Sequence, residues 1–449
     1  MKYLISLLLI ALVAGLGYLP QQSDFYLIFF LYAPLFGLYL ITYRMYTSHH
    51  DVLYFIFLSL VLRALLLFAF PNLSDDIYRF LWDGFLVDEG VNPYLHTPTE
   101  WLQSLDQQET IYHLLYPHLN SPDYYSIYPP VCQGIFAVCA KMGFGSIYWS
   151  SVIMKVIFLI AETTTIYFLL KLVQLLHIPQ HRVLLYALNP LIILEFSGNL
   201  HFEAIMIMFL TMAFWFYIRQ RSKMFSLSMG MAIGTKLLPL MFLPFFLRRF
   251  RKSKLLVGLM LLASLLLLLF VPFLSRELVL HLGTSINLYF QKFEFNSSIY
   301  YLIRWIGFRI RGYNVIQTAG PLLSIITFLF IIYLAAMEKP KKMQHVFRVL
   351  LLSFSVYLFL STTIHPWYLG IPVLLSVLTH YRYPIFWSAL IIGTYINYSY
   401  EPYHENLWVV LIEYSIVYFI LFLEVFRINI LRWLFGKVMD VFKFLTKGK

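Results

Sequence analysis

Two adjacent carboxylates, Asp75 and Asp76, are the residues whose type and position most directly suggest chemistry. They stand in the run Ser74-Asp75-Asp76-Ile77-Tyr78-Arg79-Phe80, shortly after a long apolar stretch. A neighbouring negative charge and a low-dielectric boundary both favour the protonated form of a carboxyl group, so one member of the pair could serve as a general base. Two solvated acids in the first turn of a helix, stabilised by the helix dipole, would give the same pattern.

Further polar side chains stand near the ends of other apolar stretches. They are Glu195, Asn199, His201 and Glu203; Arg304, Arg309 and Arg311; His365-Pro366-Trp367-Tyr368; and Glu401, His404 and Glu405. A polar residue near membrane depth is a functional candidate by default. His365 taken alone also suits a structural histidine, and the arginines could anchor at phospholipid head groups.

Metal or nucleotide chemistry has little support in the sequence. Glu195, His201, Glu203 and the aspartate pair have the oxygen and nitrogen atoms for a divalent site. No zinc-type spacing of His, Cys and carboxylate occurs, however, and no glycine-rich nucleotide loop is found. We therefore expect no cofactor, although a divalent metal stays open as an alternative.

The composition indicates which elements position these groups. Of 449 residues, 60% are apolar and only 12% are charged, whereas soluble domains carry about 25% charged residues. Disordered, fibrous, disulfide-rich and soluble multidomain classes are excluded, which leaves an all-α polytopic membrane protein. The net charge of +11 comes from basic residues beside apolar runs, a pattern of membrane orientation rather than nucleic-acid binding. Cys132 and Cys139, two helical turns apart, are expected to be buried and unbridged.

The apolar runs predict a single membrane domain, residues 1–449, with about 12–14 membrane helices. The candidate spans are 3–19, 25–43, 51–70, 149–171, 183–198, 201–218, 254–274, 315–336, 345–363, 366–380, 383–400 and 405–426. The first run resembles a signal peptide but has no A-x-A cleavage pattern, so we expect it to stay as a helix.

Charge sorts the connecting segments between the two sides of the membrane. Between Pro71 and Ile127 nine acidic residues face one basic residue, which places segment 71–148, with short juxtamembrane helices, outside the cytoplasm. Segment 275–314 is a second extracytoplasmic, amphipathic region. Basic loops at 219–223, 248–254 and 338–348, and the basic tail 427–449, are expected in the cytoplasm together with the N-terminus.

Two segments need special treatment to satisfy this charge pattern. Segment 224–247 lies between two basic loops, and Gly230, Gly234, Pro239 and Pro244 offer break points, so we expect a re-entrant hairpin with Lys236 at its apex. Segment 128–143 is short and is expected to be half-buried or interfacial.

The order of these motifs resembles the bacterial mannosyltransferase-like branch of the GT-C glycosyltransferases. After the acidic pair come, over residues 70–370, Tyr78-Arg79-Phe80-Leu81-Trp82-Asp83-Gly84, Gly90-Val91-Asn92-Pro93-Tyr94, Ile127-Tyr128-Pro129-Pro130, Asn189-Pro190-Leu191, Glu195-Phe196-Ser197-Gly198, Thr235-Lys236-Leu237-Leu238-Pro239, Phe295-Asn296-Ser297-Ser298-Ile299-Tyr300 and His365-Pro366-Trp367-Tyr368. Two candidate spans precede the one that leads into the acidic segment, whereas better-known relatives begin with a single span.

The resemblance implies a GT-C-like bundle with a large first extracytoplasmic catalytic loop and an inverting transfer from a polyprenyl-phosphate sugar. In the family, the catalytic acid is typically followed by Arg three residues later and by an aromatic residue four residues later. Asp76, Arg79 and Phe80 fit that spacing, so Asp76 is the expected base and Asp75 its partner. We expect the donor phosphate to contact Arg304, Lys236, His365 and Tyr368. The other expected substrate contacts are Arg79, Tyr128, His201, Glu203 and Asn296.

The expected function is therefore transfer of a hexose, mannose in the first instance, to a lipid- or glycan-linked acceptor at the outer face of a bacterial cytoplasmic membrane. Membrane lipids are expected partners and nucleic acids are not. The alternative is a lipid-linked glycan flippase or transporter, which would also need many spans and an internal cation. The long acidic segment and the lack of an inverted repeat argue against it. A structural subunit would leave the intramembrane charges unexplained.

Overall fold

The long apolar runs of the sequence fold into helices throughout the computed structural model, which describes residues 1–105, 110–247, 250, 252–338 and 343–427. No strand occurs in those ranges, and the only extended pairing there is an isolated bridge between Phe295 and Thr363. The predicted all-α polytopic class is confirmed. The tail 428–449 and parts of the basic loops at 248–254 and 338–348 lie outside the described residues.

The first half of the chain contains the first extracytoplasmic segment and the helices around it. These elements are α1 (Lys2–Tyr18), α2 (Phe25–Met45), α3 (His49–Leu65), η1 (Leu66–Phe68), α4 (Asp76–Asp88), α5 (Pro98–Ser104), α6 (Ile111–Leu115), η2 (Tyr116–His118), α7 (Pro130–Met142), α8 (Ile147–Leu175), η3 (Gln180–Val183), α9 (Leu184–Ala187), α10 (Pro190–Ile192), the π-helix η4 (Ile193–Gly198) and α11 (Glu203–Ile218).

The second half continues with shorter and longer helices in alternation. These are α12 (Ser222–Thr235), η5 (Leu238–Phe242), α13 (Leu243–Leu247), α14 (Lys252–Phe270), η6 (Val271–Phe273), α15 (Arg276–Gln291), α16 (Ile299–Arg311), α17 (Ile316–Met337), α18 (Met343–Leu360), η7 (Pro366–Leu369), α19 (Gly370–Leu378), α20 (Tyr383–Leu390), η8 (Ile391–Ser399) and α21 (Leu407–Val425).

Six of the described helices are long and apolar enough to cross a membrane. They are Phe25–Met45, His49–Phe68, Ile147–Leu175, Ser253–Phe273, Ile316–Met337 and Leu407–Val425. The pair Pro190–Gly198 and Glu203–Ile218 would add a seventh span if taken as one element, but it bends by 116°. The count is below the expected 12–14 because the other candidate spans are short or interrupted: residues 366–380 give η7 and the nine-residue α19, and residues 383–400 give α20 followed by a 3-10 helix.

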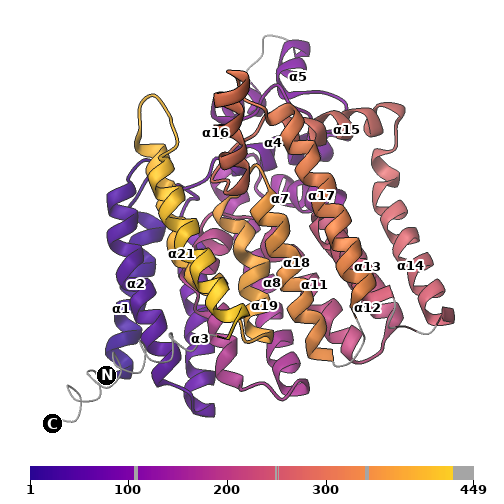
Figure 1. Ribbon diagram of the computed structural model, residues 1–449. Coiled ribbons are helices and arrows are strands. Elements are labelled where there is room, and N and C mark those ends of the chain that lie inside the picture. The colour runs from indigo at the N-terminus through magenta and orange to yellow at the C-terminus, as the bar shows by residue number, and fades with distance from the viewer. Residues whose placement is uncertain (106–109, 248–249, 251, 339–342, 428–449) are drawn as a thin grey trace.

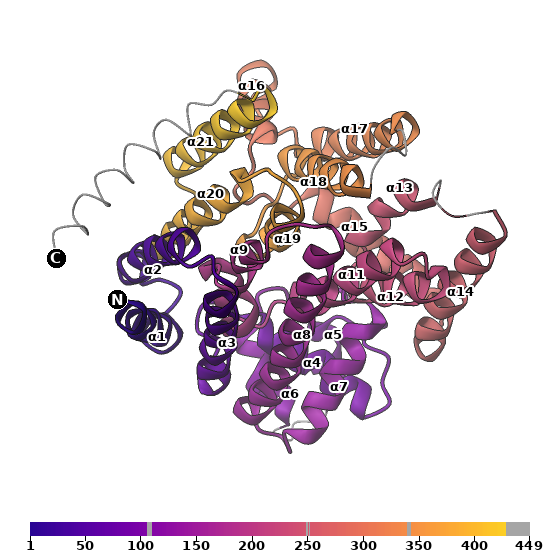
Figure 2. The same ribbon diagram turned by 90° about the horizontal axis from the view of Figure 1, so that it is seen from below.

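The helices of segments 71–148 and 275–314, which the charge pattern predicts to be extracytoplasmic, gather at one end of the bundle. Figure 1 shows α4, α5, α15 and α16 at the end opposite the N-terminus, and Figure 2 shows the long helices side by side beneath them. The expected half-buried segment 128–143 forms α7, which packs against α4 and α8. Both cysteines of α7 are buried and free, as predicted. The acidic helix α4 is thus held from one side by a helix of its own segment.

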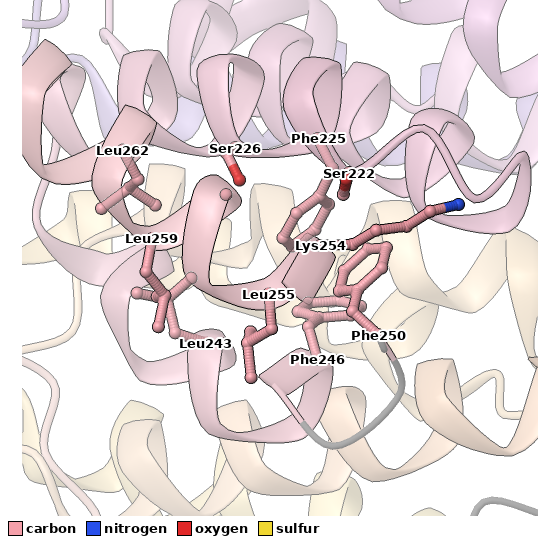
Figure 3. Close-up of a pocket in the computed structure, with 11 residues that line it drawn as sticks. Ser222, Phe225, Ser226, Leu243, Phe246, Phe250, Lys254, Leu255, Leu259 and Leu262 are labelled. Atoms are coloured by element: carbon pink, nitrogen blue, oxygen red, sulfur yellow. The ribbon is translucent and has the colours of Figure 1, made fainter. Parts of the chain in front are cut away.

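Segment 224–247 contains the expected break at Lys236. Helix α12 ends at Thr235, and Lys236 has an extended backbone before the 3-10 helix η5 and the short α13. Ser222 before this segment and Lys254 after it line the same small apolar pocket (Figure 3), so the segment starts and finishes at one end of the molecule. Its placement as a re-entrant membrane hairpin stays a prediction.

The close approach of α4 and α7 predicts a sharp effect of one methyl group. A Cβ added at Gly84 would lie 2.5 Å from the carbonyl oxygen of Phe136, a backbone atom that cannot rotate away. Gly84→Ala should therefore lower the stability of the purified protein by about 1–3 kcal/mol, measured by thermal unfolding in detergent. Gly134→Ala on α7 is the matched control, since nothing lies within 4 Å of its added Cβ. Equal stability of both variants would contradict this packing.

Candidate functional site

Helix α4 places the two aspartates at the mouth of the bundle. Asp75 is the N-cap residue and Asp76 the first residue of the helix, where the helix dipole favours negative charge. The backbone N–H of Asp76 donates a hydrogen bond to Ser74 Oγ at 3.4 Å. The Asp76 side chain is 23% exposed, so it is reachable from outside. Burial raises the pKa of Asp75 and the negative charge of Asp76 raises it further, with His118 offsetting part of the effect.

A buried histidine faces the Asp76 carboxylate. His201 Nε2 lies 3.8 Å from Asp76 Oδ2, and 3.4 Å from the hydroxyl of Ser74. Its other nitrogen, Nδ1, lies 3.0 Å from the backbone oxygen of Glu195 and 3.1 Å from the Glu195 carboxylate. The carboxylate also accepts hydrogen bonds from Asn199 and from the hydroxyl of Tyr395. Because Glu195 fixes Nδ1, Nε2 is the atom that His201 presents to Asp76.

An irregular backbone aims this histidine. Glu195 lies in the π-helix Ile193–Gly198, an uncommon form that is frequent at functional sites. Leu200, directly before His201, has a φ of +66°, a left-handed conformation that a bulky side chain rarely adopts. The chain then turns by 116° into α11. Such strain persists only where the surrounding structure maintains it, and it clusters at active sites.

Four stacked rings extend from His201 into the bundle. His201 stacks on Trp367 with ring centroids 3.6 Å apart, Trp367 on His365 at 4.4 Å, and His365 on Phe295 at 4.7 Å. The backbone of Phe295 pairs with the strand-like residues before His365, donating its N–H to Thr362 and accepting from Ile364. This ring column joins the turn before α11, through His201, and segment 275–314, through Phe295, to the loop that contains His365.

Lys236 and Glu203 lie at the same end as the ring column. They form an ion pair, with the Lys236 side chain 21% exposed and that of Glu203 nearly buried. Glu203 Oε2 has no hydrogen-bond partner among the described residues. The Lys236 ammonium lies 6.0 Å from the ring centroid of Tyr368. The charge of Lys236 is therefore neutralised by a carboxylate unless another anion binds there.

His365 is half-buried, with its Nδ1 shielded from solvent. Burial lowers its pKa to about 3, and the positive charges of His201 and Lys236 act in the same direction. Its Nδ1 has no hydrogen-bond partner in the described part of the chain. His365 thus offers a ligand a hydrogen bond rather than a positive charge.

Arg79 lies one helical turn beyond Asp76 on α4, and Tyr128 lies in the loop before α7. Arg79 pairs with Asp83 at 3.0 Å and donates hydrogen bonds to the carbonyl oxygens of Ser121 and Tyr124. The ring of Tyr128 packs edge-on against Phe80. Arg79 is buried and anchors the residues before Tyr128.

The structure does not bring Arg304 and Asn296 into this cluster. Arg304 forms an ion pair with Glu294 and covers the ring of Tyr301. The side-chain amide of Asn296 donates to Glu413 of α21 at 3.1 Å. Arg304 was expected there as a cation of an amphipathic stretch and Asn296 as part of a motif, and both have acidic partners, Glu294 and Glu413. Within the described ranges no group of three His, Cys, Asp or Glu residues is arranged to hold a metal ion.

Comparison with known families agrees with this arrangement. Residues 28–250 match the family model described as alpha-(1->6)-mannopyranosyltransferase, N-terminal domain. This part of the chain belongs to that mannosyltransferase family. The matched region contains the aspartate pair, the π-helix, His201 and Lys236, and the six apolar helices make the mannosyltransferase an integral membrane protein. No curated protein and no solved structure matches the chain.

Two residues of the mannosyltransferase site have roles that the sequence did not reveal. Glu195 stood in the polar cluster with His201, but its role as the partner of Nδ1 depends on the π-helix. Trp367 stood in a recognised motif, yet its stacking between His201 and His365 joins positions more than 160 residues apart. The short separation of positions 195 and 201 could have suggested that Glu195 contacts His201. No local pattern indicates that Trp367 stacks between His201 and His365.

The lowered pKa of His365 predicts an acid-dependent loss of stability. In the unfolded chain its pKa returns toward 6.5, so the unfolded state binds the proton first as the pH falls below that value. The contribution of His365 to the free energy of unfolding should be constant above pH 6.5. Below that pH it should fall by about 1.4 kcal/mol per pH unit until pH 3. His365→Phe should show a smaller fall in unfolding temperature between pH 7 and pH 5 than the unmodified protein. Parallel curves for the two proteins would show that His365 titrates normally.

Proposed function

We propose that the mannosyltransferase moves a mannosyl group, with inversion, from a polyprenyl-phosphate donor to a hydroxyl of a lipid- or glycan-linked acceptor at the extracytoplasmic face. The observation that carries the proposal is the placement of Asp76. Its carboxylate is partly exposed at the mouth of the bundle and faces His201, which Glu195 fixes from behind. The α-(1→6) linkage in the name of the matched family is the linkage that we propose for the product.

Asp76 acts as the base in this scheme. It takes the proton of the acceptor hydroxyl while the hydroxyl oxygen attacks the anomeric carbon of the donor. The bond between that carbon and the phosphate oxygen breaks on the opposite face, and its electron pair leaves with the polyprenyl phosphate. His201 stabilises the ionised Asp76 before the reaction and orients it through Nε2. The proton then passes from Asp76 to solvent, because the carboxylate is partly exposed.

The negative charge that develops on the leaving phosphate needs hydrogen-bond donors or cations on the side away from the acceptor. Lys236 and His365 are suited to that place, because both lie near His201 and His365 Nδ1 has no partner among the described residues. A hydrogen-bond donor in this position lowers the free energy of the transition state by about 3–4 kcal/mol if it resembles an oxyanion-hole group. A phosphate would compete with Glu203 for the Lys236 ammonium, so Glu203 sets how tightly the donor is held.

The charge pattern supports an extracytoplasmic site. Helices α4 and α5 of the acidic segment 71–148 lie at the end of the bundle where α15 and α16 also gather, opposite the N-terminus. Positively charged loops remain in the cytoplasm. A polyprenyl chain in the outer leaflet would bring its phosphate to the depth at which the ring column and Lys236 lie.

The role of Asp76 predicts a selective loss of transfer. Asp76→Asn removes the base but keeps the side-chain volume, so transfer should fall by about 10²–10⁴-fold while unfolding temperature and donor binding change little. Purified protein, polyprenyl-phosphate [³H]mannose and a mannoside acceptor provide the assay. Asp88→Asn at the other end of α4, where Asp88 pairs only with the exposed Lys141, is the matched control. Full activity of Asp76→Asn would place the base elsewhere.

The role of Glu195 predicts a change in turnover without a change in binding. Glu195→Gln keeps the hydrogen-bond geometry but weakens the hold on His201 Nδ1, so kcat should fall by about 10–100-fold with both KM values unchanged. Glu203→Gln provides the contrast, because releasing Lys236 should alter the KM for the donor instead. Steady-state kinetics of the two variants measure both effects. An unchanged kcat in Glu195→Gln would show that the Glu195–His201 pair has no role in the mechanism.

A further inference from the structure

A second, open pocket lies between the two extracytoplasmic segments. It is lined by Arg79, Ser121, Tyr124, Tyr125, Tyr128 and Phe293, with Ile127 and Ser285 at its edge. Its cavity volume is ≈ 90 Å³, below the roughly 300–1,000 Å³ of sites that bury a whole drug-sized ligand, so a ligand here would lie partly in the open. One wall comes from α4 and the residues that follow η2, and the other from the end of α15 and the residues after it.

The pocket is held rigid by buried hydrogen bonds behind it. Asp83 accepts from Arg79, from the hydroxyl of Ser126 and from the amide of Gln133, and all four side chains are buried. The two walls are joined where Tyr125 stacks on His281 of α15, with ring centroids 3.7 Å apart. Ser285 donates to the carbonyl oxygen of Tyr125, which ties α15 to the same loop. The walls are therefore formed before any ligand binds.

The polar groups of the pocket have unused hydrogen-bonding capacity. Arg79 engages Asp83 through Nε and the loop carbonyls through Nη1, and Nη2 makes no hydrogen bond to a described residue. The hydroxyls of Tyr124, Tyr125 and Tyr128 likewise make none within the described ranges. Asp83 neutralises the guanidinium, so the pocket offers donors and ring faces without net charge.

That combination fits a neutral saccharide better than a phosphate. Sugars present hydroxyl groups at their rim and apolar C–H faces that pack on aromatic rings, and the pocket supplies both partners. A phosphate would need an uncompensated cation, which the Arg79–Asp83 pair does not provide. The candidate phosphate contacts Lys236 and His365 lie instead around the ring column beside His201.

The position of the pocket selects between the two sugars of the reaction. Residues 76 and 79 lie three apart on α4, so the Arg79 side chain is on the same face as Asp76 and about 4.5 Å further along the axis. Tyr128 is also close to Asp76, whose charge raises the pKa of the phenol in addition to burial. A hydroxyl delivered to Asp76 from this side arrives from outside the membrane, opposite the lipid phosphate.

We propose that this pocket is the subsite for the glycan part of the acceptor, and that it recognises a neutral mannoside through Tyr124, Tyr125 and Arg79. The proposal rests on the proposed function, because it assigns the second substrate of the same reaction. It places the acceptor in the groove between the first extracytoplasmic segment and α15, with the attacking hydroxyl directed at Asp76.

Kinetics with a defined acceptor test the assignment. With octyl α-mannopyranoside as the acceptor, Tyr124→Ala should raise the acceptor KM by about 5–10-fold, the loss of one stacking contact and one hydrogen bond. The KM for polyprenyl-phosphate mannose should not change. Tyr124→Phe and Tyr125→Phe, which remove only a hydroxyl, should give smaller increases and guard against misfolding. Tyr313→Ala, an exposed tyrosine of the second segment outside the pocket, is the control.

Direct binding separates failure of this proposal from failure of the proposed function. The inactive Asp76→Asn protein should still bind octyl α-mannopyranoside, seen by saturation-transfer NMR, and the added Tyr124→Ala change should weaken that signal. If Asp76→Asn abolishes transfer but Tyr124→Ala leaves the acceptor KM and binding unchanged, the subsite assignment is wrong. A selective rise in the donor KM would overturn it as well, since the pocket would then hold the donor sugar. Full transfer by Asp76→Asn would overturn the proposed function itself.

Discussion

The site depends on an ionised carboxylate held at the boundary between a lipid bilayer and water. Such a group is stable there only when charge and hydrogen bonds compensate for its lost hydration. Asp76 has the dipole of α4, the hydroxyl of Ser74 near its backbone, and His201 facing its side chain. Glu195 in turn keeps His201 oriented, and the π-helix and left-handed Leu200 keep Glu195 and His201 in register. The irregular backbone is thus a consequence of what Asp76 requires.

The same requirement explains how distant segments meet. The ring column connects residues 201, 295, 365 and 367, which come from three parts of the chain. Each stacked ring restricts the movement of the next, because protein interiors are close-packed and resist small shifts. Lys236 at the break after α12 completes this region with a charge that Glu203 balances. In the proposed scheme the donor phosphate lies beside the ring column and the acceptor glycan lies in the tyrosine pocket.

Much of this architecture follows from local sequence patterns. Apolar run lengths predicted the membrane class, and nearby Gly and Pro predicted the break at Lys236. Charge predicted that segments 71–148 and 275–314 lie on one side of the membrane, and their helices gather at one end of the bundle. The aspartate pair and the Glu195–His201 cluster were visible because polar groups beside apolar runs are costly. The number of full spans was not visible, because hydropathy does not distinguish a continuous helix from α20 followed by a 3-10 helix. Arg304 and Asn296 were expected at the site, but long-range partners such as Glu294 and Glu413 decide where their side chains lie.

The central claim is that Asp76 faces the reacting carbon while the donor phosphate lies beside the ring column. A cryo-EM structure of Asp76→Asn with bound polyprenyl-phosphate mannose measures this directly. The account predicts the phosphorus atom within hydrogen-bonding reach of Lys236 and His365, and the anomeric carbon directed at residue 76. A donor whose phosphate lies at Arg304, or whose sugar points away from residue 76, would contradict it.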